Sequence, residues 1–168
     1  MNALHMIRKG INLVLSFASA LIFGAMVIIG TYQIVTRFVF NSPSTVSEEL
    51  LTYSFTWMAL LATAYVFGKR DHMRMGFLAD KFSGKVQKAL SIGAEVLIML
   101  LAGAVMVYGG FTIVQLTMTQ STASLGIPMG VVYIIIPVSG VLIVFYSILN
   151  IVDLVTGQVQ EPADAKEA

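Results

Sequence analysis

The chain of 168 residues contains no cysteine and only two histidines, and these scarcities remove several classes of chemistry. Without cysteine there is no disulfide exchange, no thiolate metal site and no thiol nucleophile. His5 and His72 lack the spacing of paired metal ligands, and neither is expected on facing membrane helices that would hold haem. The sequence also lacks a glycine-rich phosphate loop and a nucleophile beside a histidine. We therefore predict no enzyme activity and no cofactor.

Charged residues are also scarce, at 11% of the chain against 57% hydrophobic residues, so a water-soluble domain is not expected. No charge occurs in residues 10–36, 50–68 and 96–152, and the last run is long enough for two helices of about 20 residues each. The first run exceeds the apolar part of a signal peptide, so we expect it to be retained.

These runs predict an all-α integral membrane protein with one membrane domain, residues 1–152. Its four spans are expected at 11–36, 47–67, 87–114 and 127–150. The remaining residues, 153–168, have the composition of a polar, disordered tail.

Basic residues are concentrated between the second and third spans. Six of the ten lie there: Lys69, Arg70, Arg74, Lys81, Lys85 and Lys88. The connection at 37–47 has only Arg37, and the connection at 115–126 has no charge. The positive-inside rule therefore predicts that both termini and the 68–86 loop are cytoplasmic. Because the net charge is only +1, nothing indicates a nucleic-acid partner.

The basic loop has two interpretations. It could simply determine the topology. Alternatively, Met75, Leu78, Ala79 and Phe82 have the spacing of a short amphipathic helix on the membrane surface. In that case the basic side chains of Lys69, Arg70, Arg74, Lys81 and Lys85 would contact lipid headgroups or form a cytoplasmic surface. We predict the surface helix.

Several ionisable and aromatic residues border the 37–47 connection. Thr45 and Glu48 have the spacing of a helix capping box, directly after Pro43. Glu49 begins a polar and aromatic helix face that continues through Tyr53 and Trp57, a pattern that lipid alone does not require. A partner interface is therefore predicted from Arg37, Glu48, Glu49, Tyr53 and Trp57.

The third and fourth spans each contain one unusual residue. Glu95 is an acidic residue inside the third span, where it could pair with Lys88 or another cation, or form an ion or proton site. An intramembrane ion pair is the preferred interpretation, since transport sites generally gather several ligands. In the fourth span, Pro137 is expected to kink the helix or mark close packing.

Taken in order, several motifs form a recognisable set. They are Arg37-Phe-Val-Phe-Asn41, Ser47-Glu-Glu-Leu50, Trp57, Gly68, His72-Met-Arg74, Leu125-Gly-Ile-Pro128, Tyr133 and Pro137. This set resembles the small membrane subunit, or DctQ-type subunit, of tripartite ATP-independent periplasmic (TRAP) transporters. The resemblance implies a scaffold in the bacterial inner membrane that binds a larger subunit carrying the substrate and sodium sites. It also implies a periplasmic binding protein that docks from outside, and a small organic acid such as sialic acid or a C4-dicarboxylate as substrate.

Two other functions remain open from the sequence. The chain could be a self-sufficient oligomeric transporter or channel that uses Glu95, although it lacks the inverted repeat of broken helices found in many carriers. It could also be a membrane haem subunit, which the placement of the histidines disfavours. The scaffold subunit is the leading hypothesis.

Overall fold

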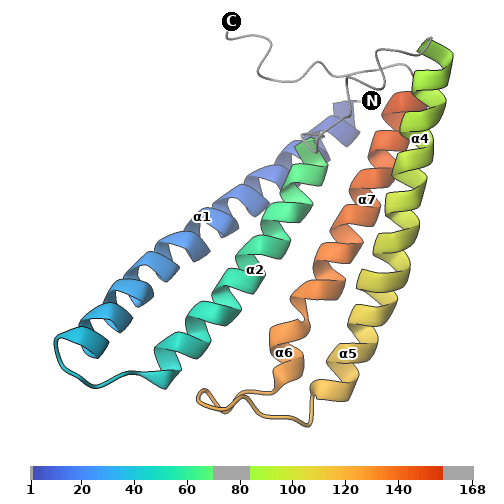
Figure 1. Ribbon diagram of the computed structural model, residues 1–168. Helices are drawn as coiled ribbons and strands as arrows, with labels where there is room; N and C mark the ends of the chain where they lie inside the picture. The colour runs from blue at the N-terminus through green and yellow to red at the C-terminus, as the bar shows by residue number, and fades with distance from the viewer. Residues whose placement is uncertain (1, 70–83, 157–168) are drawn as a thin grey trace, which may run out of the picture.

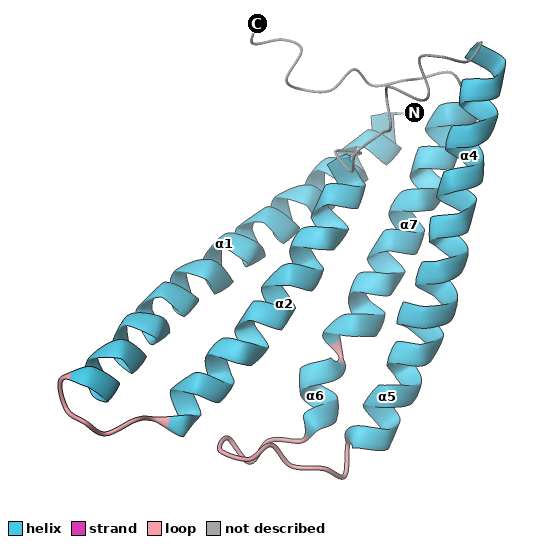
Figure 2. Ribbon diagram, in the orientation of Figure 1, coloured by secondary structure: helices cyan, strands magenta, loops and turns pink. Residues whose placement is uncertain are grey.

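The computed structural model describes residues 2–69 and 84–156, which are almost entirely helical (Figures 1 and 2). The first two spans are α1 (Asn2–Phe38) and α2 (Thr45–Lys69). The third span comprises α4 (Gly84–Leu101), the π-helix η1 (Ala102–Gly109) and α5 (Gly110–Thr117), and the fourth comprises α6 (Met129–Tyr133) and α7 (Ile135–Thr156). All four spans are long and apolar enough to cross a membrane. The prediction of four long apolar helices is confirmed.

The helices lie side by side in the order α1, α2, α7 and α4 (Figure 1). We call α1 with α2 the first hairpin, and the third span with the fourth the second hairpin. The connections 39–44 and 118–128 lie at one end of the molecule, here called the loop end (Figure 1). The opposite end, here called the terminal end, carries the start of α1 and the end of α7. This arrangement brings α2 against α7 where the hairpins meet.

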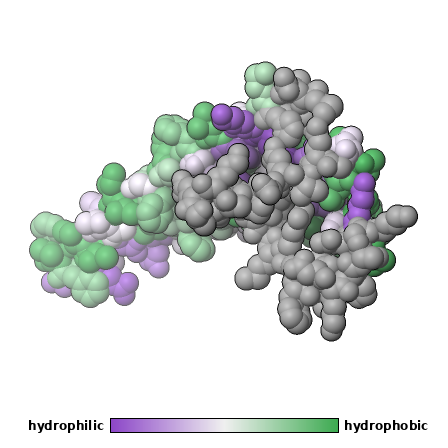
Figure 3. All heavy atoms as spheres, turned by 90° about the horizontal axis from the view of Figure 1, so that it is seen from above, coloured by the Kyte–Doolittle hydropathy of each residue, from purple (hydrophilic) through white to green (hydrophobic). Residues whose placement is uncertain are grey.

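Few apolar side chains of the described residues are buried. The core joins Leu15, Leu61 and Ala64 of the first hairpin to residues of the second, including Ile143 and Tyr146. Apolar side chains elsewhere cover the outside of the helices, as the green surface in Figure 3 shows. Only 6% of the apolar window of α1 is buried, against 39% in the fourth span. An apolar exterior of this extent requires lipid or a partner to cover it.

The fourth span is interrupted at Ile134, between α6 and α7. Pro137 explains the break, because proline has no N–H and its ring clashes with the carbonyl four residues earlier, that of Tyr133. The predicted kink is therefore confirmed. Opposite the break, a Cβ on Gly110 would lie only 2.9 Å from Pro137 Cδ, so the third and fourth spans approach closely there.

The start of α2 and the end of α7 differ from the sequence prediction, and other predicted features are not tested by the structure. The capping box of Thr45 and Glu48 is wrong, because Ser44 caps α2: its Oγ accepts the N–H of Ser47 at 3.3 Å. The fourth span continues through Asp153 to Thr156, into the region expected to be a tail. The predicted amphipathic helix and residues 157–168 lie outside the described residues. The membrane orientation stays a prediction.

Candidate partner interface

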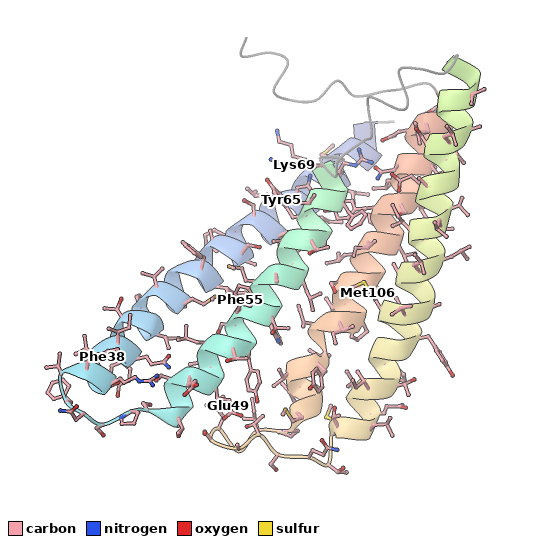
Figure 4. The ribbon with its side chains drawn as sticks, viewed as in Figure 1. Phe38, Glu49, Phe55, Tyr65, Lys69 and Met106 are labelled. Carbon is pink, nitrogen blue, oxygen red and sulfur yellow. The ribbon has the colours of Figure 1, made fainter. Side chains whose placement is uncertain are left out.

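Glu49 lies near the start of α2 and contacts the connection between α5 and α6 (Figure 4). Its Oε1 accepts the Tyr53 hydroxyl at 2.7 Å and the Ala123 N–H at 3.1 Å. Its Oε2 accepts the N–H groups of Ser124 at 2.7 Å and Leu125 at 2.9 Å. A carboxylate has about four acceptor positions, so these bonds occupy its full capacity. The Glu49 carboxylate therefore serves contacts within the chain.

The segment that binds Glu49 is a tight turn, which we call the 120–129 hairpin. Gln120 and Met129 are joined by a backbone hydrogen bond of 2.8 Å, and the Thr122 N–H donates to the Ile127 carbonyl at the same distance. Thr122 Oγ1 accepts the Ile127 N–H at 3.2 Å. Gly126 supplies the positive φ of 68° at which the chain reverses. The N–H groups at the tip are thereby aimed together at Glu49.

Trp57, in the middle of α2, forms a second link between the hairpins. Its indole Nε1–H donates to the backbone carbonyl of Val132 at 2.9 Å. That carbonyl lies beside the helix break, where the regular backbone ladder is interrupted. Trp57 therefore joins α2 to α6 beside the break.

Replacing Trp57 by phenylalanine should keep most of the ring packing and remove this donor. We expect the free energy of unfolding to fall by about 0.5–1.5 kcal/mol, the net contribution of one hydrogen bond. Thermal unfolding of the purified chain in detergent measures the effect. Phe55→Leu is a suitable control because Phe55 is 59% exposed, and an equal loss in both variants would contradict the role of the indole N–H.

The remaining two residues of the predicted interface are exposed. Arg37 lies in the last turn of α1, with its guanidinium carbon 6.0 Å from the centroid of the Phe38 ring. Glu48 lies in the first turn of α2, next to Glu49, and its side chain is exposed. The structure therefore divides the predicted cluster into Glu49, Tyr53 and Trp57, which face the second hairpin, and Arg37 and Glu48, which are open to a partner.

A buried polar cluster at the terminal end joins three helices. Arg8 of α1 donates to Asn150 Oδ1 at 2.9 Å and lies 3.1 Å from Asp153 Oδ2. Asn150 in turn donates through Nδ2 to Glu95 Oε1 at 3.0 Å. Each of these four side chains is buried. Glu95 therefore belongs to a charged network, while Lys88 donates to the Val155 carbonyl at 3.2 Å.

The sequence did not predict this cluster. Arg8 precedes the first span and contributes only to the positive-inside pattern, and Asp153 is the first residue of the predicted tail. Asn150, a polar residue in a strongly apolar run, was the available signal. Within the described ranges, no group of three or more histidine, cysteine, aspartate or glutamate residues could hold a metal ion. The polar groups thus connect helices to one another.

The basic residues predicted to meet lipid are only partly covered by the structure. Lys69 is exposed at the end of α2, with its Nζ 4.9 Å from the centroid of the Tyr65 ring. Figure 4 shows both residues near the terminal end. Lys85 lies in the first turn of α4, but its side chain is outside the described part, as are Arg70, Arg74 and Lys81.

Comparison with known proteins assigns the family. Residues 26–157 match the DctQ component of tripartite ATP-independent periplasmic transporters. The chain belongs to the DctQ family. It is 30% identical over 151 residues to the sialic acid TRAP transporter small permease protein SiaQ of Vibrio cholerae, covering 90% of this chain and 87% of that protein. It is also 25% identical over 143 residues to a Haemophilus influenzae protein named as a TRAP transporter small permease, covering 83% of each.

Membership of the DctQ family confirms the resemblance read from the motifs. The chain is a multi-pass membrane protein and the small permease component of a TRAP transporter, a transport subunit and not an enzyme. Because DctQ is one component of a tripartite system, other TRAP components are implied as partners.

Proposed function

We propose that this DctQ chain is a non-catalytic scaffold that binds and supports the large membrane subunit of a sodium-coupled TRAP transporter. The observation that carries the proposal is the combination of family membership with four apolar helices that bury little of their surface against one another. A scaffold needs such a surface, because it must present apolar helix faces to both lipid and a larger partner.

The polar side chains favour a scaffold over a self-sufficient carrier. The acceptor positions of Glu49 are filled by donors of the same chain, and Glu95 accepts a hydrogen bond from Asn150. A transport site instead requires polar groups that converge on a substrate or ion. We therefore place the substrate and sodium sites in the large subunit.

The charge distribution supports an orientation with both termini in the cytoplasm and the loop end outside. In this orientation Arg37 and Glu48 face the large subunit or the docked periplasmic binding protein. Glu49, Tyr53 and Trp57 contribute indirectly, because their hydrogen bonds hold α2 against the second hairpin. In the same orientation Lys69, exposed at the end of α2, lies on the cytoplasmic side of the inner membrane beside the lipid headgroups.

The substrate is proposed to be a small organic acid. The Vibrio cholerae relative is named for sialic acid, which makes sialic acid the first substrate to test. A C4-dicarboxylate is the second.

Co-purification tests the scaffold role. Tagged chain expressed with the large subunit of its own transporter should bring that subunit down in mild detergent. Proteoliposomes containing both, with the periplasmic binding protein added outside, should take up the organic acid only with an inward sodium gradient. The proposal is abandoned if no large subunit co-purifies, or if liposomes with this chain alone take up the acid.

Arg37→Ala should weaken the association with the large subunit or the binding protein about fivefold, corresponding to about 1 kcal/mol for an exposed charged contact. Lys9→Ala is the control, because Lys9 is an equally exposed cation at the terminal end of α1. Titration of the purified partners against each variant gives the affinities. Equal affinities for the wild type and Arg37→Ala would remove Arg37 from the interface.

A further inference from the structure

The contact between α2 and the 120–129 hairpin passes through one carboxylate. Glu49 binds three successive backbone N–H groups, of Ala123, Ser124 and Leu125, from a segment more than 70 residues away in sequence. We propose that Glu49 is a positioning residue that latches the 120–129 hairpin to α2 and so fixes how far apart the two helical hairpins stand at the loop end.

The geometry favours a latch over a direct contact with a partner. All four acceptor positions of the carboxylate are used, and Tyr53, one helical turn further along α2, occupies one of them. A partner group that bound Glu49 would have to displace a donor already in place. Glu49 therefore influences assembly through the shape that it gives to the loop end.

The latch requires a carboxylate at this length. Glutamine keeps only one acceptor oxygen and carries no charge. If that oxygen faces Ser124 and Leu125, the NH₂ group faces the N–H of Ala123, and in the opposite orientation it faces the N–H groups of both Ser124 and Leu125. In either orientation at least one backbone N–H of the hairpin loses its acceptor. Tyr53→Phe removes only one of the four bonds and leaves all three backbone N–H groups paired. The two variants should therefore differ strongly in effect.

Spin-label distances test the latch directly, because the absence of cysteine allows labels at chosen positions. Cysteines replacing Val46 of α2 and Thr119 before the hairpin would carry the labels, since both positions are exposed. In the full chain in nanodiscs, we expect Glu49→Gln to widen the distance distribution at least twofold. Tyr53→Phe should widen it far less, and Glu48→Gln, the neighbouring exposed carboxylate, should leave it unchanged.

A distribution in Glu49→Gln as narrow as that of the wild type would overturn the proposal, as would equal widening in Glu48→Gln. Hydrogen exchange of the unmodified protein provides a test that does not depend on a variant folding. The amides of Ala123, Ser124 and Leu125 should exchange at least tenfold more slowly than unstructured peptide amides. Exchange at the unstructured rate would also reject the latch.

The effect on assembly rests on the proposed scaffold function, whereas the latch itself does not. Glu49→Gln should weaken co-purification of the large subunit although Glu49 makes no contact with it, and Glu49→Asp should restore little because its carboxylate is one methylene short. If the distances change as expected but co-purification does not, the latch stands and its role in assembly is rejected. If the wild type binds no large subunit, the scaffold function fails and the latch is unaffected.

Discussion

Replacing Gly68 by valine is expected to destabilise the folded chain by about 3 kcal/mol or more, at the upper end of the usual cost of overpacking. Gly68 lies near the end of α2, where a Cβ would be 2.6 Å from both Tyr146 Cζ and Asn12 Oδ1. Tyr146 cannot easily move aside, because it is fully buried and its hydroxyl donates to Asn12 Oδ1 at 2.6 Å. The substitution should lower the thermal unfolding midpoint in detergent and reduce the monodisperse fraction after size exclusion.

Gly24→Val is the matched control for this prediction. Gly24 also lies in an apolar helix, but a Cβ there would meet nothing within 4 Å. The control therefore carries the same change in helix propensity and side-chain volume without the clash. Equal destabilisation in both variants would contradict the prediction, because the close approach of Gly68 to Tyr146 would then contribute nothing to the loss.

The architecture could be predicted from the sequence because a membrane allows few alternatives. Backbone groups in lipid must be paired within the segment, so long charge-free runs form helices almost regardless of their detailed sequence. Pro137 was equally readable, since its effect on the preceding turn is local. The π-helix η1 could not be predicted, because residues 102–109 contain no proline or charge that distinguishes them from an ordinary apolar α-helix.

The site was only half predicted, because sequence identifies unusual residues but not their partners. Glu49 and Trp57 stood out as polar and aromatic groups on one helix face. Their actual partners are backbone groups of Ala123 to Leu125 and of Val132, and a backbone N–H or carbonyl leaves no mark in the sequence. The shift of the helix cap from Thr45 to Ser44 has a simpler cause, because neighbouring hydroxyl residues compete for the same position.

Interhelical hydrogen bonds hold the helices together at both ends of the molecule. In lipid, apolar helix faces gain little by leaving the hydrocarbon, so close packing and interhelical hydrogen bonds must hold the helices together. The loop end uses the carboxylate of Glu49, the middle of α2 uses the indole of Trp57, and the terminal end uses Arg8, Asn150 and their neighbours.

The second large effect is expected at the terminal end, where Arg8→Met should lower the free energy of unfolding by about 3–5 kcal/mol, the usual cost of breaking a buried ion pair. Arg8 and Asp153 are both buried, and Arg8 also pairs the oxygen of Asn150. Methionine keeps the length and apolar stem of the side chain but removes the cation that faces Asp153. Chemical or thermal unfolding in detergent measures the loss.

Lys9→Met separates this effect from a general effect of lost charge, because Lys9 is the next residue and is exposed. It should change the unfolding free energy by less than about 1 kcal/mol, as expected for a surface charge. The double variant Arg8→Met with Asp153→Asn should recover part of the stability, since it removes the cation and the facing anion together. If the double variant is no more stable than the sum of the two single changes predicts, Arg8 and Asp153 do not act as a pair, and the stability of the terminal end must come from the contacts of Asn150 and Tyr146 instead.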